Sequence, residues 1–557
     1  MNLEQYKDIT RKIFKSGMDN YQNQFDIWQL LMDMYENLSF DDQEVREHAM
    51  TVSIYTHKMA SYQTGVTGDG KYEELYWKLL LFEARNRQVD SYFLYLDKNR
   101  DADKRFYEPR RDKFLKFGII QGMQDLIDSK IDLLTISMPP GTGKSTAGIY
   151  LLSGCLGWWP DMPNLASAHS GILTRSFYDG VSQILTDPYE YTWHEIFNGV
   201  KFNPRSDMNS KEQTINVGKP KRFKSLTCRA INASLTGATR CENLLYADDL
   251  CSGIEEALSR DRMDKLWQTY NTDLKTRKKG SAREIHIATR WTVADPIGRI
   301  QLEHKDDPRA RFISIPALDA DGESNFDYKH GVGFSKEYFE DMKMSMDDVS
   351  FRCLYMNEPI EREGLLYHED EMRRYLTLPM DKPDAILSIV DTKNTGKDYF
   401  TQPVFYKYGD DFYLVDTICS DESDYEVQYT RSVEIIKANK VEACRIESNN
   451  GGSRVAFEIN NRLQAQHFYC NITENYTTKN KETKIIVYAP WVKQHVLFKD
   501  PSLYSAKSEY GVFMGMLLGY TMAGKAPHDD APDVVAMFAE WQSRPERKQA
   551  ILMDSLF

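Results

Sequence analysis

Residues 131–146 read Ile131-Asp132-Leu133-Leu134-Thr135-Ile136-Ser137-Met138-Pro139-Pro140-Gly141-Thr142-Gly143-Lys144-Ser145-Thr146. The run from Ile131 to Ile136 is largely apolar, which predicts a buried parallel strand, and the residues from Ala147 to Leu152 have the pattern of a helix. A glycine-rich turn that joins a strand to a helix is the setting of a P-loop, in which backbone N–H groups surround phosphate groups at the helix N-terminus. The stretch therefore predicts an α/β fold built around a phosphate-binding turn.

The side chains of this turn suit ATP. Lys144 is placed to reach the β and γ phosphates, and Ser145 is placed to ligate Mg²⁺. Met138 stands where the pattern G-x-x-x-x-G-K-[ST] has its first glycine, so the start of the loop departs from the pattern, and a chance glycine-rich turn is the alternative. We expect ATP and Mg²⁺ as cofactors, with the nucleotide held by Gly141, Thr142, Gly143, Lys144, Ser145 and Thr146.

Two further strand ends are expected to complete the ATP site. A P-loop ATPase needs a carboxylate at the end of a neighbouring strand, to hold Mg²⁺ and to orient the attacking water. The apolar run 244–247 ends in Asp248, which we assign to the metal, and in Asp249, which takes the place of the longer glutamate of many motors. The strand 285–288 ends at Thr289, whose hydroxyl can sense the γ-phosphate. A helix cap or a turn is the alternative for each of these ends.

The length of the chain predicts more than one domain. Single hydrophobic cores stop growing at roughly 250 to 300 residues, and this chain has 557. A second α/β pattern opens with the apolar run 385–390, and a hairpin is expected over residues 405–415 with its turn at 409–411. We expect a helical N-terminal region (1–105), a P-loop ATPase domain (106–360), a linker (361–384), an α/β nuclease domain (385–545) and a C-terminal tail (546–557).

The second half contains carboxylates of the kind that cut phosphodiesters. Two-metal cleavage needs three or four carboxylates around a pair of Mg²⁺ or Mn²⁺ ions. Asp391 and Glu447 each end a predicted strand, and the run His528-Asp529-Asp530-Ala531-Pro532-Asp533 precedes an apolar helix. If the two strands are adjacent and parallel, these acids meet, which is the plan of ribonuclease H-like nucleases. The alternative is an N-cap role for Asp533 and turn roles for Asp391 and Asp398.

Composition and charge limit the remaining possibilities. The net charge of −13 argues against general nucleic-acid affinity, although basic clusters occur at 219–224 and 275–279, each of which suits a solvated loop equally well. No apolar run is long enough for a membrane span and the first residues lack signal character, so we expect a cytoplasmic protein. The eight cysteines include no C-x-x-C pair, which predicts reduced, buried thiols and no structural metal.

Together these motifs resemble, in their order along the chain, those of the large subunits of tailed-bacteriophage terminases. The resemblance rests on Gly141–Ser145, Ser234–Gly237, Tyr246–Asp249, Ala288–Trp291 with Asp295 and Gly298, the strand-end Asp391, Ile446–Gly452 and His528–Asp533, and it spans about residues 106–540. It implies a P-loop ATPase followed by a ribonuclease H-like nuclease, with Thr289 in the coupling motif and Arg175 or Arg240 as an arginine finger. It makes Asp391, Glu447 and Asp530 the first candidates for metal ligands, then Asp529 and Asp533, and Asp398 last.

The resemblance also implies what the protein does and with what. It implies an ATP-driven motor that moves double-stranded viral DNA into a procapsid and cuts concatemeric DNA. The expected partners are double-stranded DNA, a portal protein, a small terminase subunit and further copies of the chain in a ring, with no membrane involved. The expected location is the host cytoplasm, transiently at the portal vertex. Two rivals stay open: a helicase-nuclease of DNA repair, which would need a second motor domain, and a DNA-binding assembly protein with vestigial sites.

Overall fold

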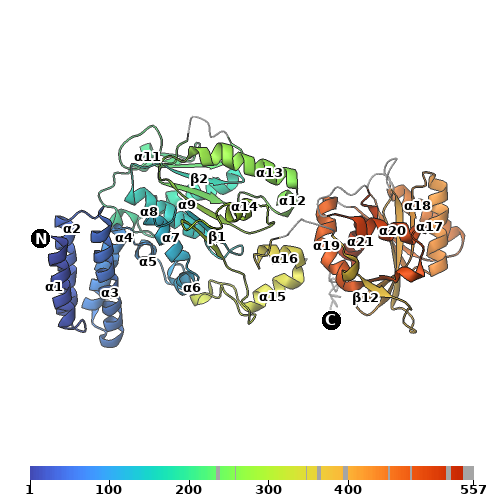
Figure 1. Ribbon diagram of the computed structural model, residues 1–557, viewed down its shortest axis with the longest axis horizontal. Helices are drawn as coiled ribbons and strands as arrows, with labels where there is room; N and C mark the ends of the chain where they lie inside the picture. The colour runs from blue at the N-terminus through green and yellow to red at the C-terminus, as the bar shows by residue number, and fades with distance from the viewer. Residues whose placement is uncertain are drawn as a thin grey trace, which may run out of the picture. The chain divides into compact units, whose positions relative to one another are not determined.

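The computed structural model describes residues 1–233, 239–257, 259–346, 348–359, 366–392, 399–448, 452–476, 480–521 and 528–543 (Figure 1). The chain forms two compact units, one comprising Met1–Met342 with Cys353–Pro359 and the other Lys343–Arg352 with Ile360–Phe557. Each unit has its own mixed sheet, of eight strands in the first and seven in the second. The expectation of two α/β sheets is therefore confirmed.

The first unit begins with five helices. They are α1 (Leu3–Lys15), α2 (Tyr21–Asn37), α3 (Gln43–Thr67), α4 (Gly70–Arg85) and α5 (Val89–Leu96). Amphipathic faces of α1 to α4 enclose an apolar cluster that includes Ile27, Leu31 and Leu79. The helices join the rest of the unit through α4 and α5: Trp158 Nε1 donates to the carbonyl of Ala84 at 2.8 Å, and the hydroxyls of Tyr92 and Ser153 share a hydrogen bond of 2.7 Å. They are thus part of the first compact unit.

The first sheet contains β1 (Leu133–Ser137), β2 (Asn164–Ala168), β3 (Met208–Asn209), β4 (Thr214–Ile215), β5 (Leu226–Ala230), β6 (Leu244–Asp248), β7 (Arg283–Ala288) and β8 (Ala310–Ser314). Its strand order is β3-β4-β5-β2-β6-β7-β1-β8, and all pairs from β5 to β8 are parallel. Strand β7 therefore lies between β1 and β6, with Ser137 opposite Ala288 and Asp248 opposite Ile287. The carboxyl ends of the three strands meet at one edge.

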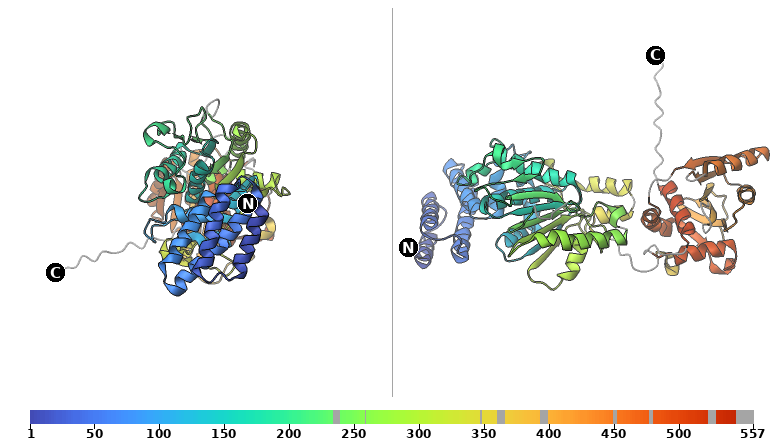
Figure 2. Two further views of the ribbon diagram at one scale, coloured as in Figure 1. Left: turned by 90° about the vertical axis from the view of Figure 1, so that its left-hand side faces the viewer. Right: turned by 90° about the horizontal axis from the view of Figure 1, so that it is seen from above.

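Helices cover both faces of this sheet (Figure 2). On one face α8 (Lys144–Trp158) packs so closely on β6 that Gly148 abuts the ring of Tyr246. On the other face, α13 (Arg260–Thr269) and η2 (Tyr270–Leu274) form an apolar cluster with Leu245. The other helical elements of the first unit are η1 (Glu108–Arg110), α6 (Arg111–Lys116), α7 (Ile119–Ile127), α9 (Gly171–Thr186), α10 (Trp193–Ile196), α11 (Pro204–Asp207), α12 (Ile254–Ala257), η3 (Lys275–Arg277), α14 (Pro296–Glu303) and η4 (Lys329–Gly331). Helices α15 (Lys336–Ser345) and α16 (Asp348–Leu354) each contain residues assigned to both units.

The second sheet contains β9 (Arg373–Tyr375), β10 (Ala385–Val390), β11 (Phe400–Tyr408), β12 (Asp411–Ser420), β13 (Ala443–Glu447), β14 (Asn471–Asn475) and β15 (Val496–Lys499), in the order β14-β13-β10-β11-β12-β15-β9. The predicted hairpin is present as β11 and β12, and Gly409 turns the chain at φ +60°. Strand β9 lies in the stretch that we expected to be a linker. It pairs with β15, so the second unit's sheet starts earlier than the hydrophobic pattern indicated.

The helical elements of the second unit are η5 (Glu369–Glu371), α17 (Tyr425–Asn439), α18 (Gly452–Ala465), α19 (Lys481–His495), η7 (Pro501–Leu503), α20 (Glu509–Gly519) and α21 (Asp530–Ser543). Buried side chains of α17 and α18 pack with those of β10 and β13 in one apolar cluster. Helix α21 packs on β11, where the rings of Phe538 and Phe405 stack at a centroid distance of 3.7 Å. This packing brings the start of α21 to the sheet.

None of the helices within the described ranges has both the length and the apolar character that a membrane span would require.

Candidate nucleotide and metal sites

The P-loop joins β1 to α8 as the sequence predicts. Helix α8 starts at Lys144, whose side chain is buried, and Gly143 at φ +103° precedes it. Thr142 stabilises the turn: its Oγ1 donates to the carbonyl of Pro139 at 2.7 Å, and its own carbonyl accepts from Tyr328 at 2.9 Å. The two hydrogen bonds of Thr142 therefore stabilise the turn, and the ammonium of Lys144 takes no part in them.

Two glycines of the turn cannot be replaced without a clash. Gly141 and Gly143 both have positive φ, and a Cβ added to either would lie 2.9 Å from an aromatic carbon, of Phe334 and of Phe106 respectively. The backbone therefore curls in a space that side chains would fill. This arrangement suits the close approach of phosphate groups to backbone N–H groups.

Asp248 has the environment of a metal ligand. Its Oδ2 accepts from the hydroxyl of Tyr246 at 2.6 Å, whereas its buried Oδ1 accepts no hydrogen bond within the described part of the chain. Burial, and then the charge of Asp249, raise the pKa of Asp248 to about 6, against the opposing effects of Tyr246, Ser145 and Lys144. A buried carboxylate oxygen with no partner, beside the P-loop serine, fits Mg²⁺.

Asp249 connects the strand end of β6 to that of β7. Its Oδ1 accepts from the backbone N–H of Thr289 at 3.0 Å, and its carbonyl accepts from the backbone N–H of His169 at 3.2 Å. The residue has φ +41°, a left-handed conformation that aspartate tolerates better than most residues. The structure thus brings Asp249 and Thr289 together, and it adds His169, which the sequence did not single out.

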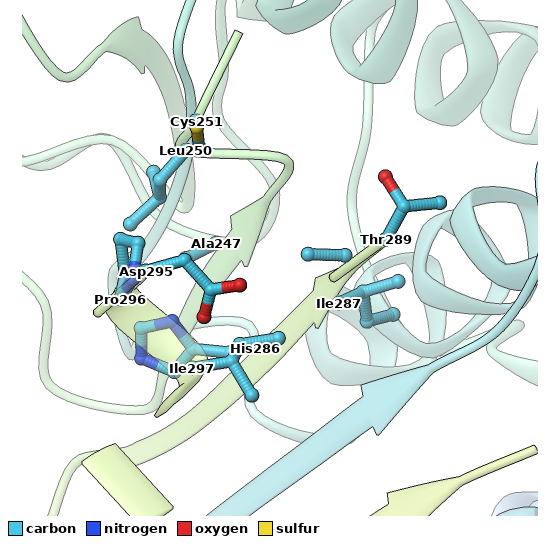
Figure 3. Close-up of a pocket in the computed structure, with 10 residues that line it drawn as sticks. Ala247, Leu250, Cys251, His286, Ile287, Thr289, Asp295, Pro296 and Ile297 are labelled. Carbon is cyan, nitrogen blue, oxygen red and sulfur yellow. The ribbon is translucent and has the colours of Figure 1, made fainter. Parts of the chain in front are cut away.

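Asp295 and Gly298, which follow the strand end at Thr289, stabilise the backbone there. Arg290 donates from Nε to both carboxylate oxygens of Asp295, at 3.1 and 3.0 Å, and Asp295 caps α14 by accepting from the N–H of Gly298 at 2.8 Å. A Cβ on Gly298 would lie 2.1 Å from the carbonyl oxygen of Val293. Asp295 and Thr289 line one narrow pocket (Figure 3). The ion pair of Arg290 with Asp295 and the cap of α14 therefore fix the backbone that follows Thr289.

The two candidate arginine fingers make contacts away from the P-loop. Arg175 pairs with Asp179 at 3.1 Å and donates to the carbonyl of Ser210 at 2.7 Å, while Arg240 pairs with Glu242. Both side chains are close to half exposed, at 45% and 42%. By contrast Arg110, which the sequence did not indicate, packs against Gly143 with its Nε buried.

The two basic clusters contribute to the fold. Lys221 donates to the carbonyl of Val217 at 3.2 Å, and Lys278 pairs at 2.8 Å with Glu284, a buried residue of β7. At least one lysine of each cluster therefore stabilises the first unit, in addition to any contact with a polyanion.

In the second unit Asp391 and Glu447 lie side by side. Strands β10 and β13 are adjacent and parallel, with Val390 opposite Ile446, so the residues that follow are at the same edge of the sheet. Burial, and then the charge of Asp533, raise the pKa of Asp391 well above its ordinary value, and a hydrogen bond with Glu447 acts in the same direction. The expected meeting of distant acids is confirmed for these strands.

Helix α21 supplies the third acid. It starts at Asp530, so Asp530 and Asp533 lie within its first turn, and the carbonyl of Asp529 accepts from the N–H of Asp533 at 2.9 Å. After burial, the charge of Asp533 contributes to the raised pKa of Asp391, and that of Asp530 contributes to the raised pKa values of Tyr399 and Cys419. Which of these aspartates ligates a metal ion stays a prediction.

Two lysines lie beside these aspartates, and no sequence motif predicted them. Lys481 Nζ lies 2.9 Å from Asp529 Oδ1 and 3.4 Å from Asp533 Oδ2, and Lys484 Nζ lies 2.7 Å from Asp533 Oδ1. Within the described ranges, no three acidic, histidine or cysteine side chains are already arranged to ligate a metal ion. The oxygen donors suit Mg²⁺ or Mn²⁺, but lysines now pair with some of them.

Several predicted features lie outside the described residues. They are Ser234–Gly237, Asp398, Asn449–Gly451 and the C-terminal tail 546–557.

One family model matches part of the second unit. Residues 390–497 match the model of the family described as Terminase Bacteriophage T7, Ribonuclease H-like domain. This match begins at Val390, the last residue of β10, and runs through β11 to β14 into β15, so it includes both Asp391 and Glu447. No curated protein matches the chain.

Solved terminase structures are similar at low identity. The large terminase of bacteriophage HK97 is 11% identical, with 81% of this chain and 98% of that chain covered and a TM-score of 0.35. For the large terminase of a thermophilic bacteriophage the values are 12%, 77%, 98% and 0.36. The human cytomegalovirus terminase nuclease domain is 12% identical over 32% of this chain and 95% of that chain, with a TM-score of 0.27.

Proposed function

We infer that this chain is a phage terminase large subunit, since its residues 390–497 match the ribonuclease H-like domain of that family. We propose that the first unit hydrolyses ATP to move double-stranded DNA into a procapsid, and that the second unit cuts concatemeric DNA. The observation that carries the proposal is that one chain has both a P-loop and two strand-end acids, Asp391 and Glu447, on adjacent parallel strands.

In the ATPase, the residues of the P-loop hold the nucleotide. The backbone N–H groups from Gly141 to Thr146 and the ammonium of Lys144 bind the phosphates, and Ser145 and Asp248 hold Mg²⁺. Bound Mg²⁺ neutralises the charge that develops on the phosphates. Asp249 orients the attacking water, and its contact with the N–H of Thr289 links hydrolysis to β7. Arg175 or Arg240 acts as an arginine finger, in cis or from a neighbouring subunit.

In the nuclease, Asp391, Glu447 and Asp533 are the proposed metal ligands, with Asp529 and Asp530 as further candidates. Bound Mg²⁺ or Mn²⁺ supplies Lewis acidity at the scissile phosphate. The protein contributes fixed carboxylates, because β10 and β13 are held in register by the sheet and α21 is anchored by the stacked rings of Phe405 and Phe538.

The proposed partners are double-stranded DNA, a portal protein, a small terminase subunit and further copies of this chain in a ring. The proposed location is the host cytoplasm, transiently at the portal vertex. A repair helicase-nuclease is less well supported, because the described residues contain one P-loop sheet and no second motor sheet.

A paired assay tests this function. ATP turnover with and without DNA, and Mn²⁺-dependent cutting of plasmid DNA, are measured on the wild-type chain and on the Lys144→Ala and Asp391→Ala variants. We expect the first change to lower turnover by about 1,000-fold while cutting continues, and the second to do the reverse, because the sites are on separate sheets. If either change abolished both activities in a folded protein, independent sites would be refuted. DNA that failed to stimulate turnover would favour the vestigial assembly protein.

A further inference from the structure

Lys481 and Lys484 are the unexpected feature of the nuclease site. They are the first and fourth residues of α19, so they lie one turn apart on one face of the helix. The two lysines differ in burial: the side chain of Lys484 is 2% exposed, whereas that of Lys481 is 40% exposed. Lys484 is therefore inside the fold, and Lys481 is at the surface of the acid cluster.

The position of these lysines is electrostatically unfavourable for the helix itself. The N-terminus of a helix carries a partial positive charge, so cations in the first turn destabilise it, and acids are preferred there. Both ammonium groups are compensated by acids of another element, Asp529 and Asp533 at the start of α21. The buried pair of Lys484 with Asp533 already joins α19 to α21. A second, partly exposed pair adds little stability, typically about 0–1 kcal/mol, so anchoring does not account for Lys481.

The two oxygens of Asp533 are both opposite lysines. Oδ1 lies 2.7 Å from Lys484 Nζ, and Oδ2 lies 3.4 Å from Lys481 Nζ. In a two-metal site a carboxylate commonly bridges two cations that are about 3.5 to 4 Å apart, which takes both of its oxygens. Asp533 cannot bridge in this way while both lysines stay. Asp391 and Glu447 follow adjacent parallel strands at the same edge of the sheet, so one cation can bind between their carboxylates.

We propose that Lys481 takes the place of the second metal ion, so that the nuclease site holds one divalent cation, between Asp391 and Glu447, and the Lys481 ammonium contacts the scissile phosphate. Lys484 is a positioning residue, which acts by holding Asp533. This inference rests on the proposed nuclease function and replaces the two-metal expectation drawn from the sequence.

The chemistry needs no further reactant. A water oxygen bonds to phosphorus and one P–O ester bond breaks. One proton of the water goes to the leaving oxygen, and the other is released to solvent as the new phosphate monoester ionises. Lys481 stays protonated throughout and stabilises the negative charge that develops on the non-bridging oxygens, as a second cation would.

Counting bound Mn²⁺ tests the proposal without relying on activity. The full chain, free of nucleotide, is titrated with Mn²⁺ by isothermal calorimetry, and free Mn²⁺ is followed by electron paramagnetic resonance. We expect Asp391→Asn to bind one ion fewer than the wild type, and Lys481→Ala to bind one ion more. The control is Lys493→Ala, since Lys493 is a lysine of the same helix that pairs with Glu371, and this variant should bind as the wild type does.

Two results would overturn the proposal. One is a loss of two ions in Asp391→Asn, and the other is an unchanged ion count in Lys481→Ala. A different result applies to the proposed function itself: if Asp391→Asn changed neither the ion count nor the cutting of plasmid DNA, the nuclease assignment would fail, whatever the role of Lys481.

Cutting kinetics give an independent readout. At Mn²⁺ concentrations too low to fill the additional site, Lys481→Ala should lower the cutting rate by about 100-fold, the typical effect of removing one transition-state donor, and Lys481→Arg should restore most of it because the charge is kept. Wild-type cutting by Lys481→Ala at these low Mn²⁺ concentrations would contradict the contact with phosphate. If Lys481→Ala proved poorly folded by circular dichroism, Lys481→Gln would be measured in its place, with the same expectations.

Discussion

The ATP site and the nuclease site differ in how the negative charge of their strand-end acids is balanced. Each places acids at the carboxyl ends of parallel strands, Asp248 on β6 and Asp391 after β10. At the ATP site, Asp248 keeps an oxygen without a hydrogen-bond partner among the described residues, and the nearby cation is the P-loop lysine. At the nuclease site, two lysines of α19 lie at ion-pair distance from the acids before and within α21, although Asp533 Oδ1 likewise accepts no hydrogen bond from the described residues. The nuclease acids therefore face two ammonium groups from another helix, whereas the ATP site relies on the lysine of its own motif.

The difference shows how each site obtains its charge balance. Most of the ATP site comes from one continuous motif, so Mg²⁺ enters together with the nucleotide that brings the compensating phosphates. The nuclease site gathers residues from β10, β13, α19 and α21. Built-in cations keep those acids from repelling one another before DNA and metal arrive.

The first prediction concerns ATP turnover and the contact of Asp249 with strand β7. Asp249→Asn keeps an oxygen that can accept from the N–H of Thr289 but removes the negative charge. We expect ATP turnover to fall by about 100-fold or more, with nucleotide affinity nearly unchanged, because the charge acts on the attacking water. Steady-state turnover and nucleotide binding by calorimetry are the measurements. Normal turnover would show that the water is oriented by another residue.

A smaller effect, on stability, is expected from the packing beneath the P-loop. A Cβ on Gly148 would lie 2.2 Å from the ring of Tyr246, so Gly148→Ala should destabilise the first unit by about 2 to 3 kcal/mol. The matched control is Gly515→Ala in α20 of the second unit, where nothing lies within 4 Å of the added Cβ. That change should be neutral or stabilise by about 0.5 to 1 kcal/mol, as expected for alanine in a helix. Thermal unfolding, with ATP turnover and cutting as reporters of each unit, compares the two.

The unpartnered oxygen of Asp248 leads to a smaller stability change of opposite sign. Because its pKa is raised to about 6, the charge that it carries at neutral pH destabilises the nucleotide-free protein. Asp248→Asn should therefore raise the midpoint of urea unfolding at about pH 7.5, by on the order of 1 kcal/mol in free energy, while ATP turnover is lost. An unchanged or lower midpoint would mean that the carboxylate is already compensated, as the nuclease acids are.

The last prediction concerns the rate at which the cysteines react with a thiol reagent. All eight are buried, and burial raises the pKa of Cys155 in the first unit and of Cys419 in the second to about 12. The reactive thiolate is therefore scarce at about pH 8, and the native protein should react with a disulfide reagent far more slowly than the protein in urea. Mass spectrometry of the labelled chain at intermediate urea would show which unit opens first. Rapid labelling of a single cysteine in the native protein would contradict the burial.

Some features were predictable because they are local. The P-loop needs only a strand, two glycines at positive φ and a helix that starts at Lys144, and neighbouring residues determine all of these. The hairpin of β11 and β12 is local for the same reason. Strand β9 was missed, since three residues with two arginines lack a hydrophobic pattern and become a strand only by pairing with β15.

The site residues divide in the same way. The sequence by itself determined that Asp249, Glu447 and Asp391 stand at the ends of strands. An apolar run followed by a carboxylate can be recognised without knowing what packs against it. Only the tertiary structure decided that the charge of Asp533 acts on Asp391, and that Lys481 and Lys484 lie beside Asp533. The physical reason is that the face a helix presents, and the charges it meets, depend on how α19 and α21 pack, and residues far apart in the chain set that packing.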